Sequence, residues 1–182
     1  MSQATPIIYM ILSALQFIVL LRFICQAMEV RYYNPVTQSV VKFSDYILLP
    51  FNLFGLKSNI YYLLLVLYVF TFFKIYLPLL TSSQVYPINS LLIISFGYLL
   101  KDLINIFWYL IIISAIKSWF NIFVNHPLFT LIDELCEPLY MRVRMILPTF
   151  SGIDFSPIVI LFLLQLLEII LLPRIFNLSS VL

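Results

Sequence analysis

Apolar stretches long enough to cross a membrane occur four times along this chain, and mixed or polar segments separate them. A hydrocarbon core about 30 Å thick takes roughly 20 apolar residues in a helix that rises about 1.5 Å per residue. The pattern predicts spans over residues 6–25, 60–80, 97–116 and 158–176. The third apolar run begins at Ile88 and contains Lys101 and Asp102, which a long tilted helix would accommodate.

The composition excludes a soluble domain, because 63% of the 182 residues are hydrophobic and only 10% are charged. The first 21 residues contain neither Lys nor Arg, so we expect the first span to stay in the mature protein rather than to act as a secretory signal. A net charge of +2 and the lack of a basic patch argue against nucleic acid as a partner. The expected partner is the lipid bilayer, with its anionic inner leaflet.

The basic residues outside the spans predict the orientation. Two long connections join the spans, over residues 26–59 and 117–157. Their basic residues are Arg31, Lys42, Lys57, Lys117, Arg142 and Arg144. The other side carries only Arg174. The positive-inside bias therefore places both long connections in the cytoplasm and both termini outside.

An internal repeat appears when the second half is laid on the first with a shift of 92 residues. Pro35 then falls on Pro127, Asn34 on His126, and the first span covers residues 98–117. The chain is therefore predicted to hold two repeated helical pairs in the same orientation, residues 1–80 and 91–182, joined by a linker over 81–90.

The segment after each of these prolines has the spacing of an amphipathic helix. The apolar positions are Val36, Val40, Phe43 and Ile47 in the first copy and Leu128, Ile132, Leu135 and Leu139 in the second. Pro suits the first helical turn, and Asn34 before it is a good N-cap. We expect each segment to be a cytoplasmic interfacial helix, with a dedicated partner-docking face as the alternative.

The most distinctive sequence follows the second such segment. It contains Arg142, Arg144 and Pro148, then Gly152, Asp154, Ser156 and Pro157 before the fourth span. The arginines suit phosphate headgroups, Pro148 and Gly152 break the chain, and Ser156 with Pro157 starts a helix whose dipole favours Asp154. This pattern indicates either the plain start of a membrane span or a contact site for a partner or lipid.

The Pro-centred amphipathic stretch, the Arg-rich segment ending in Leu-Pro, and Gly-x-Asp-Phe-Ser-Pro before an apolar helix resemble the YggT family over essentially the whole chain. The first copy departs from the pattern, since Gly55-Leu-Lys57-Ser-Asn59-Ile60 replaces the Gly-x-Asp-Phe-Ser-Pro motif. The resemblance implies little about activity, because the family has no established reaction. It implies roles in membrane organisation and assembly, such as division, osmotic tolerance or the assembly of membrane complexes.

An enzyme is not expected. His126 is the sole histidine and has no companion His or Cys at metal-ligand spacing. No nucleophile elbow or Gly-rich phosphate loop is present. Cys25 and Cys136 are predicted to be unremarkable reduced thiols.

Ionisable residues inside the predicted spans form a second group of candidates, because charges are costly in a bilayer. They are Lys74, Lys101, Asp102 and Glu168, which counting from the span ends places at similar depth. Our hypothesis pairs Glu168 with Lys74 or Lys101. Gln16 is deep enough to form a hydrogen bond across helices.

We therefore expect an all-α membrane protein of about four transmembrane helices in the bacterial inner membrane, without enzymatic activity, metal or cofactor. Its expected function is to organise or assist the assembly of envelope components through a membrane-protein partner or self-association. The alternative is a small ion channel or transporter subunit that uses the intramembrane charges. The candidate contact residues are Asn34, Pro35, His126, Pro127, Arg142, Arg144, Pro148, Gly152, Asp154, Ser156 and Pro157.

Overall fold

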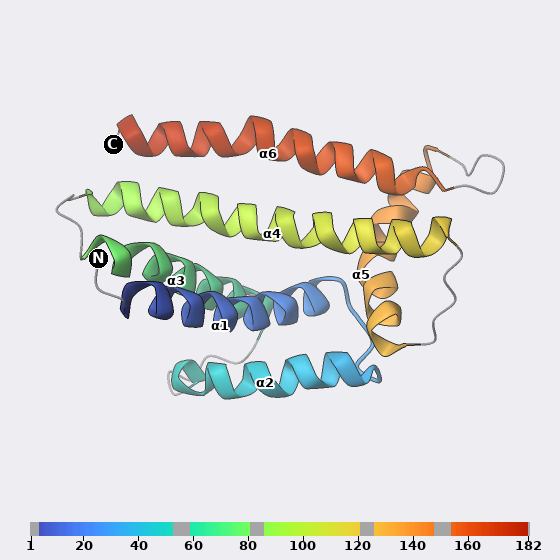
Figure 1. The fold of residues 1–182 in the computed structure, drawn as a ribbon, viewed down its shortest axis with the longest axis horizontal. Coiled ribbons are helices and arrows are strands. Elements are labelled where there is room, and N and C mark those ends of the chain that lie inside the picture. The colour runs from blue at the N-terminus through green and yellow to red at the C-terminus, as the bar shows by residue number, and fades with distance from the viewer. Residues whose placement is uncertain (1–3, 53–58, 81–85, 121–125, 148–153, 182) are drawn as a thin grey trace.

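The computed structural model describes residues 4–52, 59–80, 86–120, 126–147 and 154–181. Over these ranges all the regular secondary structure is helical (Figure 1). The helices are α1 (Ala4–Ala27), α2 (Pro35–Asn52), α3 (Ile60–Leu79), α4 (Ile88–Trp119), α5 (Pro127–Arg144) and α6 (Ser156–Val181). The all-α prediction is confirmed.

The four long helices α1, α3, α4 and α6 are long and apolar enough to cross a membrane, as the sequence predicts. They stand in a row in which α1 packs on α3, α3 on α4, and α4 on α6 (Figure 1). Neighbours in the row run in opposite directions, so that α1 begins and α6 ends at the same end of the row (Figure 1). This end is called the terminal end below, and the opposite one is called the connection end.

The third span is one continuous helix. Helix α4 begins at Ile88, inside the segment predicted as a linker, and runs without a break through Lys101 and Asp102 to Trp119. These two charges do not interrupt the helix, and the carboxylate of Asp102 is paired with Lys74 from α3. The third apolar run therefore forms one long helix, as the sequence allows.

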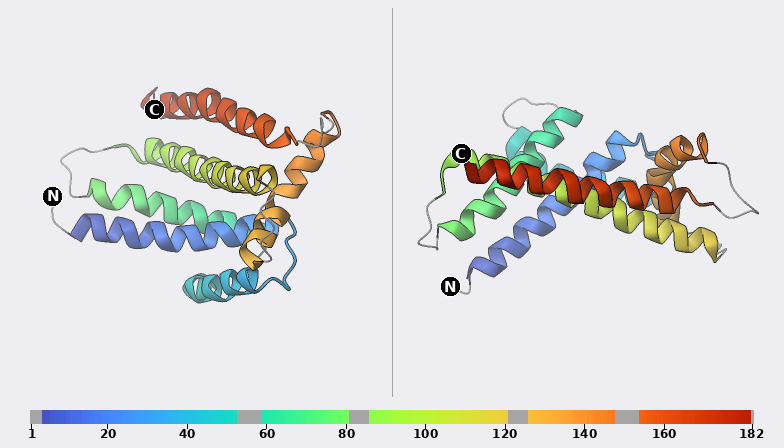
Figure 2. Two further views of the ribbon diagram at one scale, coloured as in Figure 1. Left: turned by 45° about the vertical axis from the view of Figure 1, so that its right-hand side comes forward. Right: turned by 90° about the horizontal axis from the view of Figure 1, so that it is seen from above.

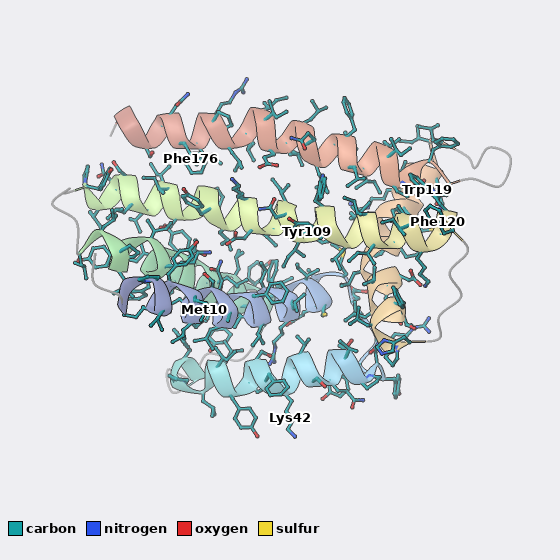
Figure 3. All side chains as sticks on the ribbon, in the orientation of Figure 1. Met10, Lys42, Tyr109, Trp119, Phe120 and Phe176 are labelled. Atoms are coloured by element: carbon teal, nitrogen blue, oxygen red, sulfur yellow. The ribbon has the colours of Figure 1, made fainter. Side chains whose placement is uncertain are left out.

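Two clusters of buried side chains hold the helices together. The larger one lies between α1 and α3 and includes Leu48 of α2 and Leu99 of α4. The smaller one joins α4, α5 and α6 through Ile111, Ile132, Cys136, Tyr140 and Ile160. At the terminal end, α4 and α6 approach so closely that a Cβ on Gly97 would lie 2.8 Å from a ring carbon of Phe176 (Figure 3).

The two short helices take different positions. Helix α2 lies along α1 and runs back from the connection end (Figure 1), and the ring of Phe51 near its end is 5.9 Å from that of Phe70 in the middle of α3. Helix α5 crosses the connection end, over α4 and α6 (Figure 2). Phe43, which belongs to the predicted apolar stripe of α2, is 61% exposed. The residues of α2 that are buried instead are Thr37, Ser44 and Leu48, which lie next to the predicted stripe.

Candidate functional site

The joint between α5 and α6 is built around Arg144, in the last turn of α5. Its Nε and Nη2 donate to Oδ2 of Asp154 at 2.9 and 2.6 Å, and its Nη1 donates to Oε1 of Glu137 at 2.8 Å. The other carboxylate oxygen of Asp154 accepts a hydrogen bond from the backbone N–H of Ser156 at 2.9 Å, at the first residue of α6. One arginine and one aspartate thus connect the end of α5 to the start of α6.

The charges in this joint stabilise one another. Burial raises the pKa of Asp154, but the Ser156 N–H and the Arg144 guanidinium outweigh it, and the pKa falls below its usual value. Burial likewise lowers the pKa of Arg144, and the carboxylates of Asp154 and Glu137 outweigh it and raise the pKa. Both groups are therefore charged over the physiological range, and two charge-assisted hydrogen bonds from Arg144 converge on the single oxygen Oδ2 of Asp154.

The other candidates of this segment have separate positions. Arg142 is exposed, and no ion pair involves it over the described ranges. Pro157 and Ser156 are buried, and the Ser156 hydroxyl has no hydrogen-bond partner in the part of the chain that the structure describes. Pro148 and Gly152 lie outside the described residues.

Exposed apolar side chains surround the joint. We call them the corner patch, and its members are Met141, Met145, Ile146 and Phe155, with exposed fractions of 55, 79, 82 and 40%. Trp119, at the end of α4, contributes to the same region and donates its indole N–H to the backbone oxygen of Asp154 at 3.2 Å (Figure 3). The Arg144 joint thus holds an apolar surface at the connection end.

The starts of α2 and α5 are directly connected. Asn34 caps α2 by accepting the backbone N–H of Val36 at 2.9 Å, and its Nδ2 donates to the backbone oxygen of Pro127 at 2.7 Å. His126 caps α5 by accepting the N–H of Leu128 at 3.2 Å. Pro35 and Pro127 each occupy the first position of their helix. These four candidates therefore meet at one junction.

The middle of the row contains a polar network from three helices. Lys74 of α3 donates to Oδ2 of Asp102 on α4 at 2.9 Å. The side-chain amide of Gln16 on α1 donates to the same oxygen at 3.0 Å and to the hydroxyl of Thr71 on α3 at 2.9 Å. Gln16, Thr71 and Asp102 each lie near the midpoint of their helix, so the network lies at the middle of the row's height.

The four intramembrane charges are only partly brought together. The structure pairs Lys74 with Asp102 rather than with Glu168. Within the described ranges no ion pair includes Lys101 or Glu168, and Glu168 lies on α6, which packs on α4 and α5. The hydrogen bond expected of Gln16 is present and reaches two helices.

Sequence reasoning did not find Thr71 or Glu137 as parts of these sites. A threonine inside an apolar helix is common, because its hydroxyl can bond the preceding turn, as Thr71 does with the oxygen of Leu67. Glu137 lies seven residues before Arg144, two helical turns away. That spacing on a predicted helix was the available signal.

The two cysteine thiols are free and buried. Burial raises the pKa of Cys136 to about 12, so its thiol stays protonated. Burial also raises the pKa of Tyr140, whose hydroxyl is 3.5 Å from the backbone oxygen of Ile111. Among the described residues, no three His, Cys, Asp or Glu side chains gather in a way that would hold a metal ion.

Four apolar helices in a row, with two short helices attached at one end, define a multi-pass helical membrane protein. A family model described as CCB3/YggT matches residues 93–175. A Haemophilus influenzae protein described as uncharacterised is 32% identical over 172 residues, which cover 92% of this chain and 91% of that protein. The "Uncharacterized protein YggT" of Escherichia coli K12 is 30% identical over 172 residues, covering 92% and 88%. The chain belongs to the YggT family. No solved structure matches it significantly.

Proposed function

We propose that this protein organises or helps to assemble other components of the bacterial inner membrane, and that it does so without catalysing a reaction. The observation that carries the proposal is the corner patch, in which exposed apolar side chains surround a rigid joint of charged residues. Apolar side chains held beside fixed charges are typical of surfaces that bind another protein. The chemistry suits a membrane protein that meets this one at the bilayer surface.

The proposed orientation places the connection end in the cytoplasm. Arg31, Lys42, Lys117, Arg142 and Arg144 all belong to that end or to the helices attached there. Basic residues beside spans favour the cytoplasmic side, where the leaflet is anionic. In this orientation the corner patch faces cytoplasmic or inner-leaflet partners, and both termini are outside.

The transport alternative has less support. A channel or transporter that uses all four intramembrane charges requires them in one cluster, whereas Lys74 and Asp102 form a pair without Lys101 or Glu168. A single ion pair between neighbouring helices is also a common structural element of membrane proteins.

Photocrosslinking in intact cells tests the assembly role. A photoreactive amino acid is placed at Met145 or Phe155, and the captured proteins are identified by mass spectrometry. We expect one heterologous membrane protein to be captured reproducibly. The matched control carries the same probe at Leu178, an exposed position at the terminal end of α6, and is expected to capture lipid or other proteins.

Two arginine variants sharpen the test. Arg144→Ala opens the joint and should abolish the specific capture, whereas Arg142→Ala removes an equal charge two residues away and should leave it intact. Capture that is the same from Leu178, or that survives Arg144→Ala, would overturn the proposal. Capture of only a second copy of the chain would replace assembly with self-association.

A further inference from the structure

The polar network in the middle of the row borders a crevice between α1, α3 and α4. Its volume is about 310 Å³, and its walls include Tyr9, Ser13, Phe17, Asn105 and Tyr109 as well as network members. Tyr109, which is labelled on α4 in Figure 3, is one of these wall residues and is 63% exposed. A crevice of this size is large enough for several water molecules or for one small solute.

Two buried polar atoms beside the crevice have no partner over the described part of the chain. Oε1 of Gln16 has none, although the Gln16 side chain is almost fully buried and its amide N–H groups are both used. The hydroxyl of Ser13, one turn away on α1, has none either. A buried acceptor without a donor costs about 1–3 kcal/mol. These atoms therefore call for a group that donates hydrogen bonds.

The charges at the crevice restrict what that group can be. Lys74 and Asp102 are both present and form an ion pair at 2.9 Å, so the wall carries no net charge. A cation entering the crevice would meet Lys74, and an anion would meet Asp102, with no further charge to compensate for its desolvation. A neutral molecule with both donors and acceptors can bond Gln16 and Ser13 without this cost.

We infer that the crevice between α1, α3 and α4 is a hydrated binding site, at the centre of the bilayer, for a small uncharged solute with hydroxyl or amide groups. The solute donates to Oε1 of Gln16 and to the hydroxyl of Ser13. The site does not depend on the corner patch, which lies at the connection end.

Thiol labelling of the full-length protein in membranes tests whether the crevice holds water. The two natural cysteines are both buried and provide a low background. Asn105→Cys places a thiol of similar size in the crevice. Leu167→Cys is the matched control, because Leu167 is exposed near the midpoint of α6, away from the crevice. Thiolates in water attack the sulfur of thiosulfonate reagents and displace a sulfinate, so we expect Asn105→Cys to react about tenfold faster than Leu167→Cys.

Protection by solutes tests binding. Urea or glycerol should slow the labelling of Asn105→Cys, whereas sucrose at the same osmolality should not, because it is too large for the crevice. Adding Ser13→Ala or Gln16→Leu to the Asn105→Cys protein should reduce this protection. The matched variant Ser95→Ala should leave the protection unchanged, because the Ser95 hydroxyl donates to the backbone oxygen of Leu91 away from the crevice.

Each other outcome overturns the inference. Equal labelling of Asn105→Cys and Leu167→Cys would mean that the crevice is dry and filled by lipid chains. Fast labelling without protection by urea or glycerol would mean that it holds water only. Protection that persists in both Ser13→Ala and Gln16→Leu would remove these atoms from the site, and if Gln16→Leu fails to fold, Ser13→Ala still decides.

Discussion

Helices α2 and α5 are both 18 residues long, both begin at a proline, and their starts are 92 residues apart, yet they occupy different positions. Helix α2 lies along α1 and reaches the middle of α3, whereas α5 crosses the connection end (Figures 1 and 2). Their lengths and starts are matched, so the difference must come from what each helix contacts.

The depth of a basic residue in the preceding span explains the difference. Arg22 lies about one and a half turns before the end of α1, and its guanidinium is bound by the backbone oxygen of Val41, Ser44 and Asp45 of α2. Lys117 lies in the last turn of α4 and pairs with Asp133 of α5. A deep arginine needs acceptors at its own depth, so α2 must lie alongside α1. A lysine at the helix end is satisfied by a helix that crosses that end.

The largest expected effect comes from removing the deep arginine. Arg22→Leu should lower the free energy of unfolding by about 3 kcal/mol, because the Arg22 side chain is only 10% exposed and bonds three groups of α2. Denaturant unfolding in mild detergent measures the change. The control Lys42→Leu changes an exposed lysine of α2 that points away from the bundle (Figure 3). Equal losses in both variants would show that Arg22 does not hold α2.

A smaller loss is expected at the α5–α6 joint. Arg144→Leu should cost about 2 kcal/mol, because it leaves the carboxylate of Asp154 only 13% exposed and without its cation, although Arg144 itself is partly solvated. Arg142→Leu should cost less than about 0.5 kcal/mol. The double variant Arg144→Leu with Asp154→Asn should regain part of the loss, and no recovery would contradict the pairing.

The caps of α2 and α5 should differ as well. Asn34→Ala should cost about 1.5 kcal/mol, because it removes both the cap of α2 and the bond to Pro127. His126→Ala should cost about 0.5 kcal/mol, since His126 is exposed and makes only its own cap. Thermal unfolding of the two variants compares them directly, and the reverse order would mean that the junction contributes nothing.

The smallest effect is the dependence of the joint on pH. The pKa of Asp154 is lower in the folded protein than its ordinary value, so its stabilising contribution is complete above that value, about 3.9, and is lost as the pH falls through the folded pKa. The stability difference between the natural chain and Asp154→Asn should be constant above about pH 5 and shrink below about pH 4. A difference that grows on acidification would contradict the depressed pKa.

Helical spans are predictable from this sequence because hydrocarbon thickness sets their length and composition. The two proline starts and the cap at Asn34 follow from local backbone chemistry, and the structure has them at the expected residues. The conclusion that the two halves are copies of one unit, with matching interfacial helices, stays a prediction. The different positions of α2 and α5 are not visible in their similar apolar spacing.

The sequence by itself determined a multi-pass helical membrane protein of the YggT family, because hydropathy and motif residues act locally along the chain. Only the tertiary structure decided which charges meet. Lys74 has a carboxylate candidate on α4 and another on α6, and the row places α3 against α4, so Asp102 is its partner. Counting residues from the ends of a span gives the depth of a side chain, but it does not say which helix lies beside it. The order of the helices in the row depends on packing between residues that are far apart in sequence.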